Sequence, residues 1–150
     1  MSSKPKILFI LTSHVELGST GKPTGWYLPE FAHPWQVLNP VADITVASPA
    51  GGEAPLDPAS VEASKEDSVS VDFHRNQSAL WKNTAKLSSF AGRAKEFDAI
   101  FFVGGHGRMK SIYSISKART RSADMRRDSN VRPRDLVLHP CSHQRVLRRE

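Results

Sequence analysis

Three places in the sequence carry side chains whose types could support chemistry, and the first is Glu30. It follows Trp26, Tyr27 and Leu28 and comes shortly before Phe31 and more apolar residues. Partial burial among such side chains would raise the pKa of the carboxyl group and suit it to proton transfer. The alternative is a solvated carboxylate at the start of a helix, where the helix dipole favours a negative charge. The residues alone favour this alternative.

The second place is the run Gly104-Gly105-His106-Gly107, which directly follows an apolar segment. Glycines at the end of a strand allow a tight turn and leave backbone N–H groups available to an anion or an oxyanion. The simpler interpretation is a tight turn with no role in binding. The spacing alone weighs the two interpretations evenly.

The third place is Cys141, which alternates with His139 and His143, so that on a strand all three side chains would face one way. Such a set could ligate zinc, but no fourth ligand is evident. Cys141 and His143 could instead act as nucleophile and base, although nothing in the spacing fixes such a thiolate near Glu30. The sequence has no H-E-x-x-H or Cys-x-x-Cys pattern and no phosphate-binding loop, and we expect neither a metal nor a cofactor.

The elements that must position these residues alternate between strands and helices. Continuous apolar runs predict three buried strands, at Lys6–Leu11, Asp43–Ala47 and Phe97–Val103. Apolar spacing predicts a helix over Trp26–Leu38, bent or restarted at Pro34, and short helices near 61–70 and 78–87. This order is typical of a doubly wound α/β domain with a parallel sheet. Ligands of such domains bind beyond the carboxyl ends of the strands, where both the carboxylate and the glycine run are expected.

Composition indicates an ordinary globular protein. The length of 150 residues suits one domain, and 39% hydrophobic with 24% charged residues is usual for a soluble one. No apolar run approaches the roughly 18 residues of a membrane helix, and the N-terminus lacks the features of a signal peptide. A single cysteine excludes an internal disulfide framework and favours a reducing compartment. We therefore expect a cytoplasmic protein with no membrane partner.

The net charge of +6 is distributed unevenly along the chain. Residues 1–108 hold 10 Lys+Arg and 11 Asp+Glu, whereas residues 109–150 hold 11 Lys+Arg and 4 Asp+Glu. The basic stretch from Arg119 to Arg134 could contact phosphate backbones, but it has no interleaved aromatic side chains to stack on bases. Nucleic-acid binding is therefore not the favoured interpretation of the charge.

Three segments together resemble one known family: Gly25–Pro34, Thr45–Gly52 and Phe97–Gly107. In this order they are similar to the ThiJ/PfpI superfamily, and most to its branch of stress-inducible chaperones and glutathione-independent glyoxalases, over about residues 4–109. The resemblance implies a flavodoxin-like, doubly wound parallel sheet of the class I glutamine-amidotransferase type. It also implies cofactor-free conversion of methylglyoxal to D-lactate, an activity also named D-lactate dehydratase. Related members are credited with deglycation and with holding unfolded clients.

By this resemblance, Glu30 matches the family's proton-transferring glutamate, and Gly105 matches a backbone N–H that stabilises an oxyanion. The family's nucleophile is a cysteine on a strand-to-helix elbow that reads Ala-Val-Cys-His-Gly-Pro, and its thiolate forms a hemithioacetal with the aldehyde. That elbow is expected in the mid-130s, where the segment Arg134–Gln144 does not contain it. Cys141 comes late and has no glycine behind it, so Cys141 and His143 match the elbow only weakly.

We therefore predict two parts: residues 1–109 as the N-terminal portion of a ThiJ/PfpI-type domain, and residues 110–150 as a basic, Arg/Ser-rich segment foreign to that fold and poorly ordered. A shifted reading frame, a retained intron or a mis-called gene end would each explain the change. The sheet would then lack the family's later strands, which leaves an unpaired edge and an apolar face uncovered. The expected protein is truncated and weakly active or inactive, and a homodimer is left open. The alternative is a non-catalytic, chaperone-like protein that binds clients.

Overall fold

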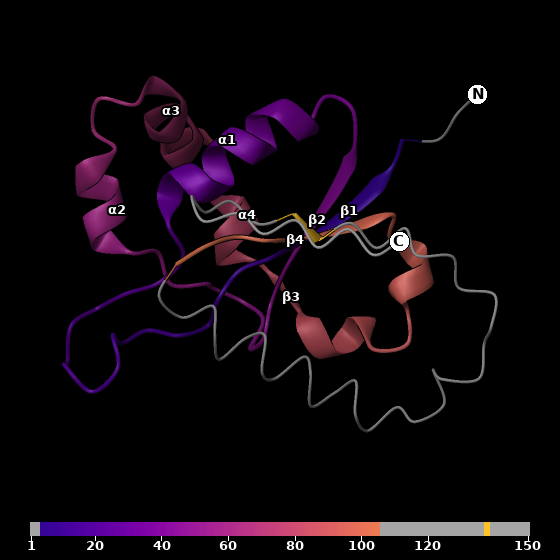
Figure 1. Cartoon of the computed structure of the whole chain (residues 1–150), viewed down its shortest axis with the longest axis horizontal. Helices are drawn as coiled ribbons and strands as arrows, with labels where there is room; N and C mark the ends of the chain where they lie inside the picture. Colours follow the sequence, from indigo (N-terminus) through magenta and orange to yellow (C-terminus); the bar gives the residue numbers. More distant parts are fainter. Residues whose placement is uncertain (1–3, 106–136, 139–150) are drawn as a thin grey trace, which may run out of the picture.

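The computed structural model describes residues 4–105 and 137–138, which form a parallel sheet flanked by helices (Figure 1). Its strands are β1 (Lys6–Ile10), β2 (Asp43–Ser48), β3 (Ala85–Lys86), β4 (Ala99–Phe102) and β5 (Val137–Leu138). They are ordered β3-β2-β1-β4-β5, and every pairing is parallel. The predicted α/β class with a flavodoxin-like parallel sheet is confirmed.

β1 lies at the centre of the sheet because its side chains are apolar on both faces. Ile7 and Phe9 belong to one buried cluster, and Leu8 and Ile10 belong to another, as expected for a strand whose successive side chains point in opposite directions. β1 pairs with β2 on one side and with β4 on the other. The three strands expected from apolar runs are all present, with ends that differ by two residues or fewer.

The longer helices pack on one face of the sheet, where Figure 1 shows α1 and α3 together. The helices are α1 (Leu28–Leu38), α2 (Pro58–Ala63), α3 (Ser68–Asn76) and α4 (Ala79–Lys82). Pro34 lies inside α1, which continues past it to Leu38, so of the two expected effects of this proline, a bend or a restart, the restart does not occur. Proline removes one helical hydrogen bond, but packing on both sides of it, by Phe31 and Trp35 against Phe73, holds the helix together.

The two short helices expected near 61–70 and 78–87 are wrong in their boundaries. The first region contains the end of α2 and the start of α3, because Asp57 and Asp67 each cap a separate helix with their side chains. The second region contains α4 and then β3, followed by a 3-10 helix, η1 (Leu87–Phe90). Cap residues inside an apolar pattern therefore decided these boundaries, and the periodicity alone missed them.

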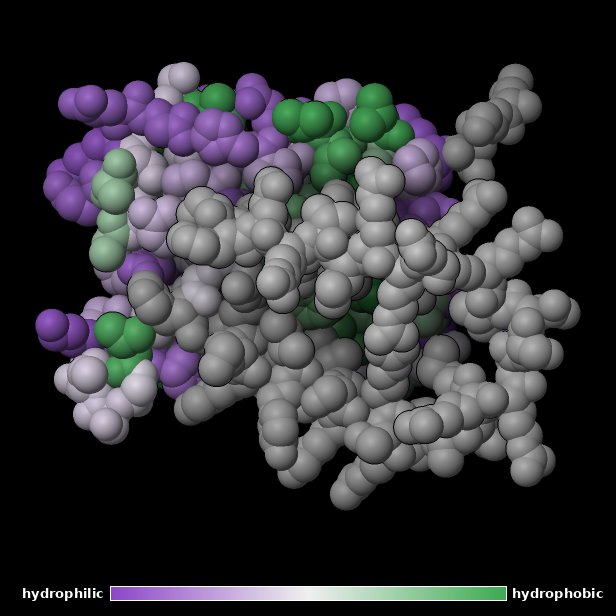
Figure 2. All heavy atoms as spheres, viewed as in Figure 1, coloured by the Kyte–Doolittle hydropathy of each residue, from purple (hydrophilic) through white to green (hydrophobic). Residues whose placement is uncertain are grey.

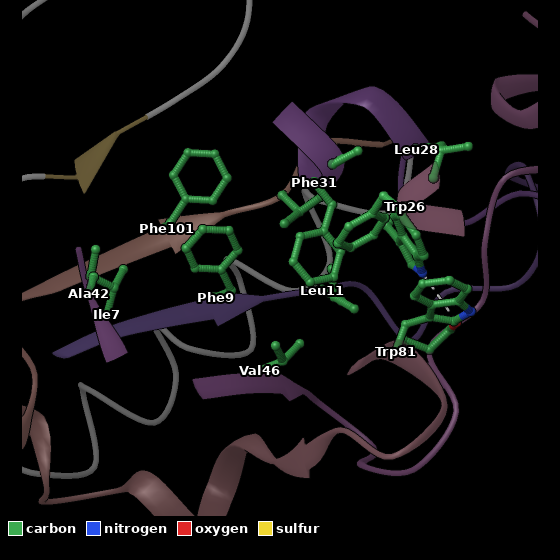
Figure 3. Close-up of a cluster of buried hydrophobic side chains, with 14 residues drawn as sticks. Ile7, Phe9, Leu11, Trp26, Leu28, Phe31, Ala42, Val46, Trp81 and Phe101 are labelled. Atoms are coloured by element: carbon green, nitrogen blue, oxygen red, sulfur yellow. Dashed lines mark hydrogen bonds between the residues drawn. The ribbon is translucent and has the colours of Figure 1, made fainter. Parts of the chain in front are cut away.

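Aromatic side chains dominate the core beneath the helices, as Figure 3 shows for Phe9, Phe31, Trp26, Trp81 and Phe101. The ring of Phe31 lies with its centroid 5.5 Å from that of Phe9 and 5.4 Å from that of Trp26. Phe9 and Phe101, from neighbouring strands, lie 4.7 Å apart. Such tilted and edge-on pairs add stabilisation beyond the buried apolar area.

The opposite face of the sheet carries Leu8, Ile10 and Ala47, which are buried. The residues packed against them are only partly buried: Ala85, Leu87, Phe90, Phe97, Ile100 and Phe102. Within the described part of the chain, the helical segments on this face are η1 and a second short 3-10 helix, η2 (Ala94–Glu96). The two faces thus differ in the size and burial of the layer that covers them.

β5 is the part of the C-terminal segment that the structure describes. It pairs with β4, with Val137 in register with Ile100 and Leu138 with Phe101. The rest of the prediction for 110–150 lies outside the described residues. Among the residues described, no helix has the length and apolar character needed to cross a membrane.

The visible surface over α2 and α3 is mainly hydrophilic, and hydrophobic residues gather in a small patch toward the end of α1 (Figure 2). Two valines near that end, Val37 and Val41, are exposed. The outer surface over α2 and α3 is thus mainly hydrophilic, whereas apolar side chains of the helices pack into the core.

Candidate active site

Glu30 lies in the first turn of α1, two residues after the end of the segment Thr24–Leu28, which we call the strap. On one side the strap runs along the end of β4, where the N–H of Tyr27 donates a hydrogen bond of 2.9 Å to the carbonyl of Gly104. Tyr27 is also the N-cap residue of α1. The hydrogen bond therefore ties the beginning of the helix to the carboxyl end of a central strand.

On its other side the strap is bonded to the loop that leads into α2. The N–H of Trp26 donates to the carbonyl of Pro55 at 2.9 Å, and the carbonyl of Trp26 accepts from the N–H of Asp57 at 3.0 Å. The indole N–H of the fully buried Trp26 donates to the carbonyl of Ala54 at 3.2 Å. A Cβ on Gly25 would lie 1.9 Å from the Pro55 oxygen, so this close approach requires glycine.

The carboxylate of Glu30 contacts the backbone of Gly104. A Cβ added to Gly104 would lie 1.4 Å from Oε2 of Glu30 and 2.4 Å from its Cδ, so the carboxylate occupies the space that any other side chain would fill. Oε2 itself is buried, while the residue as a whole is partly exposed. The fold thus places a partly buried carboxylate directly on the carboxyl end of β4, as expected for a site in this type of sheet.

Gly105 continues the same close approach. Its φ of 138° lies in the region that favours glycine, and a Cβ there would lie 2.3 Å from the carbonyl oxygen of Gly25. Gly105 also forms an antiparallel bridge with Trp26. Its backbone therefore lies beside the strap, close in the chain to the contact between Gly104 and Glu30.

The structure brings together two of the residues singled out from the sequence, Glu30 and Gly105, just beyond the carboxyl end of β4. The third set, His139, Cys141 and His143, lies outside the described residues, as does His106. The nearest described residue before Cys141 is Leu138, in register with Phe101 on β4. The roles of Cys141 and His143 remain predictions.

Sequence reasoning missed the loop that supports the strap from the α2 side. Asp57 and Ser60 are both buried and bonded to the strap or to its supporting backbone. A signal was present, because Asp57-Pro58 is an N-cap residue followed by proline at the first helical position. Thr12 was missed as well: it is buried at the end of β1 and accepts a hydrogen bond from the N–H of His14 at 3.0 Å.

A hydrogen-bonded pair of ionisable side chains lies a turn further along α1. Nε2 of His33 lies 2.7 Å from Oδ2 of Asp67, the cap residue of α3. The hydroxyl of Ser70 donates to the same oxygen, and this hydrogen bond, with a smaller contribution from His33, lowers the pKa of Asp67 below 3.8. Since the imidazole of His33 is engaged with Asp67, we assign this histidine to the packing of α1 on α3.

Two surface cavities among the described residues lie beside α3, one next to α1 and the other next to α2. The larger, about 480 Å³, is lined by Trp35, Phe73 and neighbouring residues, and the smaller, about 230 Å³, by Leu28, His74 and others. Glu30 does not line either one. Within residues 4–105 and 137–138, no group of three His, Cys, Asp or Glu side chains could hold a metal ion.

Comparison with solved structures gives matches to this fold at substantial sequence identity. The Rapid Encystment Protein of 24 kDa from Francisella tularensis is 32% identical, with a TM-score of 0.60 over 78% of this chain and 55% of its own. Glyoxalase III from Candida albicans is 27% identical, with a TM-score of 0.62 over 81% of this chain and 53% of its own. A third crystal structure is 37% identical, with a TM-score of 0.57 over 71% of this chain and 45% of its own.

The chain therefore spans about half the length of the solved structures that it matches. No protein-family model and no curated protein sequence matches it. The parallel sheet with a carboxylate at its carboxyl edge defines an α/β protein of flavodoxin-like architecture. The chain belongs to a ThiJ/PfpI-like superfamily, which confirms the resemblance recognised in its motifs at the level of the superfamily.

Proposed function

We propose that this chain carries the proton-transfer part of a glyoxalase-type site, with Glu30 as the acid and base and methylglyoxal as the substrate. The contact of the Glu30 carboxylate with Gly104 at the carboxyl edge of the sheet is the observation that carries the proposal. The similarity to a glyoxalase III supports the class of reaction. The glyoxalase branch, suggested by the three sequence motifs, makes D-lactate the expected product.

The reaction adds one water to methylglyoxal and redistributes hydrogen between two carbons. The aldehyde carbon is oxidised to the carboxylate while the neighbouring ketone is reduced to an alcohol, so no external oxidant or reductant is required. After a nucleophile has added to the aldehyde, Glu30 would take the proton from that carbon and return a proton to its neighbour. A backbone N–H at Gly105 would stabilise the oxyanion that forms in the addition step.

The nucleophile is the part of the site for which this chain departs from the family. Cys141 with His143 is the candidate pair that the sequence offers, without the glycine that follows the family's Cys-His pair. Because an unsupported thiol is a weaker nucleophile, we expect D-lactate formation well below that of a complete glyoxalase. We place the reaction in the cytoplasm, where the single cysteine stays reduced. Whether the chain forms a homodimer is left open.

The test is D-lactate formation from methylglyoxal by the full chain. Glu30→Gln should lower the rate about 100-fold or more, since a positioned acid–base group contributes on that order. Glu66→Gln is the matched control, because Glu66 is an exposed glutamate in the turn before α3. Equal rates for the parent and Glu30→Gln would refute the role of Glu30. An unchanged rate in Cys141→Ala would exclude Cys141 as the nucleophile.

A second candidate function is client binding without catalysis, and the second face of the sheet favours it. Phe90 and Phe97 are only partly buried there, and exposed apolar surface is what unfolded chains bind. This function predicts suppressed aggregation of a model client while methylglyoxal is consumed no faster than in buffer. Clear D-lactate formation together with no effect on aggregation would refute it.

A further inference from the structure

We propose that Ser60 is a positioning residue for Glu30: its hydroxyl caps α1 from the neighbouring helix α2 and so holds the carboxylate against Gly104. The relevance of this cap to catalysis rests on the proposed function, but the cap itself does not.

α1 begins without a side-chain cap from its N-cap residue. Tyr27 occupies that position and makes no side-chain hydrogen bond to the helix. Tyrosine has no short side-chain oxygen that could reach the first N–H groups, whereas Ser, Thr, Asp and Asn do. At the second helical position, Pro29 has no N–H that needs a partner. The N–H of Leu28 is thus the first helical donor, and it requires a partner from elsewhere.

Ser60 provides this partner. The N–H of Leu28 donates to Oγ of Ser60 at 3.1 Å, across a sequence separation of 32 residues. Leu28 is 1% exposed and Ser60 is fully buried, so water does not replace this bond. A buried N–H without a partner destabilises the folded state.

A second bond fixes the orientation of the hydroxyl. Ser60 donates its single proton to the carbonyl of Asp57 at 2.6 Å, which leaves its oxygen lone pairs directed to the N–H of Leu28. Asp57 is in turn bonded to the strap, because its Oδ2 accepts from the hydroxyl of Thr24 at 3.3 Å. Hydrogen bonds therefore connect the start of α2 to the start of α1 and to the strap before it.

The cap is connected to Glu30 through the first turn of α1. Glu30 lies two residues beyond Leu28 in the same helical turn, and its own N–H donates to the carbonyl of Tyr27 at 3.1 Å. At the other end of the Glu30 side chain, the carboxylate contacts the backbone of Gly104. A first turn that loses its cap can shift or fray, and the carboxylate would then leave this contact.

The experiment compares two buried hydroxyls of the α2 segment in the full chain. Ser60→Ala removes the cap, whereas Ser64→Ala removes a buried hydroxyl that donates only to the carbonyl of Ser60, at 2.7 Å. NMR of the side-chain carboxyl over pH gives the pKa of Glu30, and amide hydrogen exchange reports on Leu28. We expect Ser60→Ala to speed exchange at Leu28 about tenfold and to change the pKa of Glu30 by about 0.5 or more. Ser64→Ala should leave both values close to those of the parent.

Ser60→Thr keeps the hydroxyl and should return both values toward those of the parent, which also serves if the alanine variant is too unstable to measure. An unchanged Glu30 pKa in Ser60→Ala, or an equal change in Ser64→Ala, would overturn the proposal. Neither readout needs turnover. If Glu30→Gln leaves D-lactate formation unchanged, the proposed function fails while the cap still stands or falls on the NMR values. In an active chain, Ser60→Ala should lower kcat more than it raises KM.

Discussion

The two faces of the sheet are built from the same strands, but the described residues cover them very differently. On the face beneath α1 and α3, Phe9, Phe31 and Trp26 are completely buried, and the ring of Phe31 contacts those of the other two. On the other face, Phe90 and Phe97 contact each other at 5.5 Å but remain partly exposed. The difference shows where this part of the chain concentrates its packing energy.

The well-packed face is also the one that carries the candidate site. Trp26 belongs to the strap, and Phe31 is the residue directly after Glu30. Both side chains are fully buried, so the backbone on each side of the carboxylate is fixed by packing as well as by hydrogen bonds. Precise positioning of an acid–base group requires such support from rigid neighbours. Among the described residues, the aromatic side chains of the other face are only partly buried.

The largest expected effect comes from replacing one aromatic residue on each face of the sheet and comparing the losses of stability. Phe31→Ala should lower the free energy of unfolding by about 3–5 kcal/mol, because it leaves a cavity among three aromatic rings. Phe97→Ala should cost only about 1 kcal/mol, since that ring is partly exposed and can be replaced by water. Urea unfolding followed by tryptophan fluorescence measures both. Equal losses would mean that the second face is as well covered as the first.

A second, smaller effect tests the contact on which the site depends. Gly104→Ala places a methyl group where Glu30 has its carboxylate, and we expect a loss of about 1–3 kcal/mol from overpacking. Truncating the carboxylate should relieve the clash. The double variant with Glu30→Ala and Gly104→Ala should therefore lose about 1 kcal/mol less free energy of unfolding than the two single losses added together.

Gly92→Ala is the control for this double-mutant cycle. Gly92 has a positive φ of 79° but open space around its Cβ position, so its substitution should cost only backbone strain and show no coupling to Glu30. Strict additivity between the changes at Gly104 and Glu30 would show that the two groups do not contact each other in solution.

The sequence predicted the strands and the edge of the site well, for a physical reason. A strand buried on both faces needs a continuous apolar run, so β1 and β4 were visible, and their carboxyl ends located both Glu30 and the glycine run. The support of the site was not visible, because the bond between Leu28 and Ser60 joins residues far apart in the sequence and depends on tertiary packing. Apolar periodicity does not show whether packing holds a helix together across a proline, so it could not decide between a bend and a restart at Pro34; the helix does not restart there.

The smallest expected effect compares one ion pair on each face as the pH falls. Asp67 on the helical side has a pKa lowered below 3.8, so its carboxylate stabilises the folded state above about pH 4, and this contribution is lost as the pH falls through the folded-state pKa. Asp67→Asn should therefore lower the free energy of unfolding by a few tenths to about 1 kcal/mol at pH 6, and the difference from the parent should shrink below pH 4. Glu96→Gln breaks the fully exposed pair with Arg93 beside η2 and should change nothing measurable at either pH. Thermal unfolding at pH 6 and pH 3 distinguishes the two, and an equal, pH-independent loss in both variants would show that α1 and α3 are not held together by Asp67 and His33.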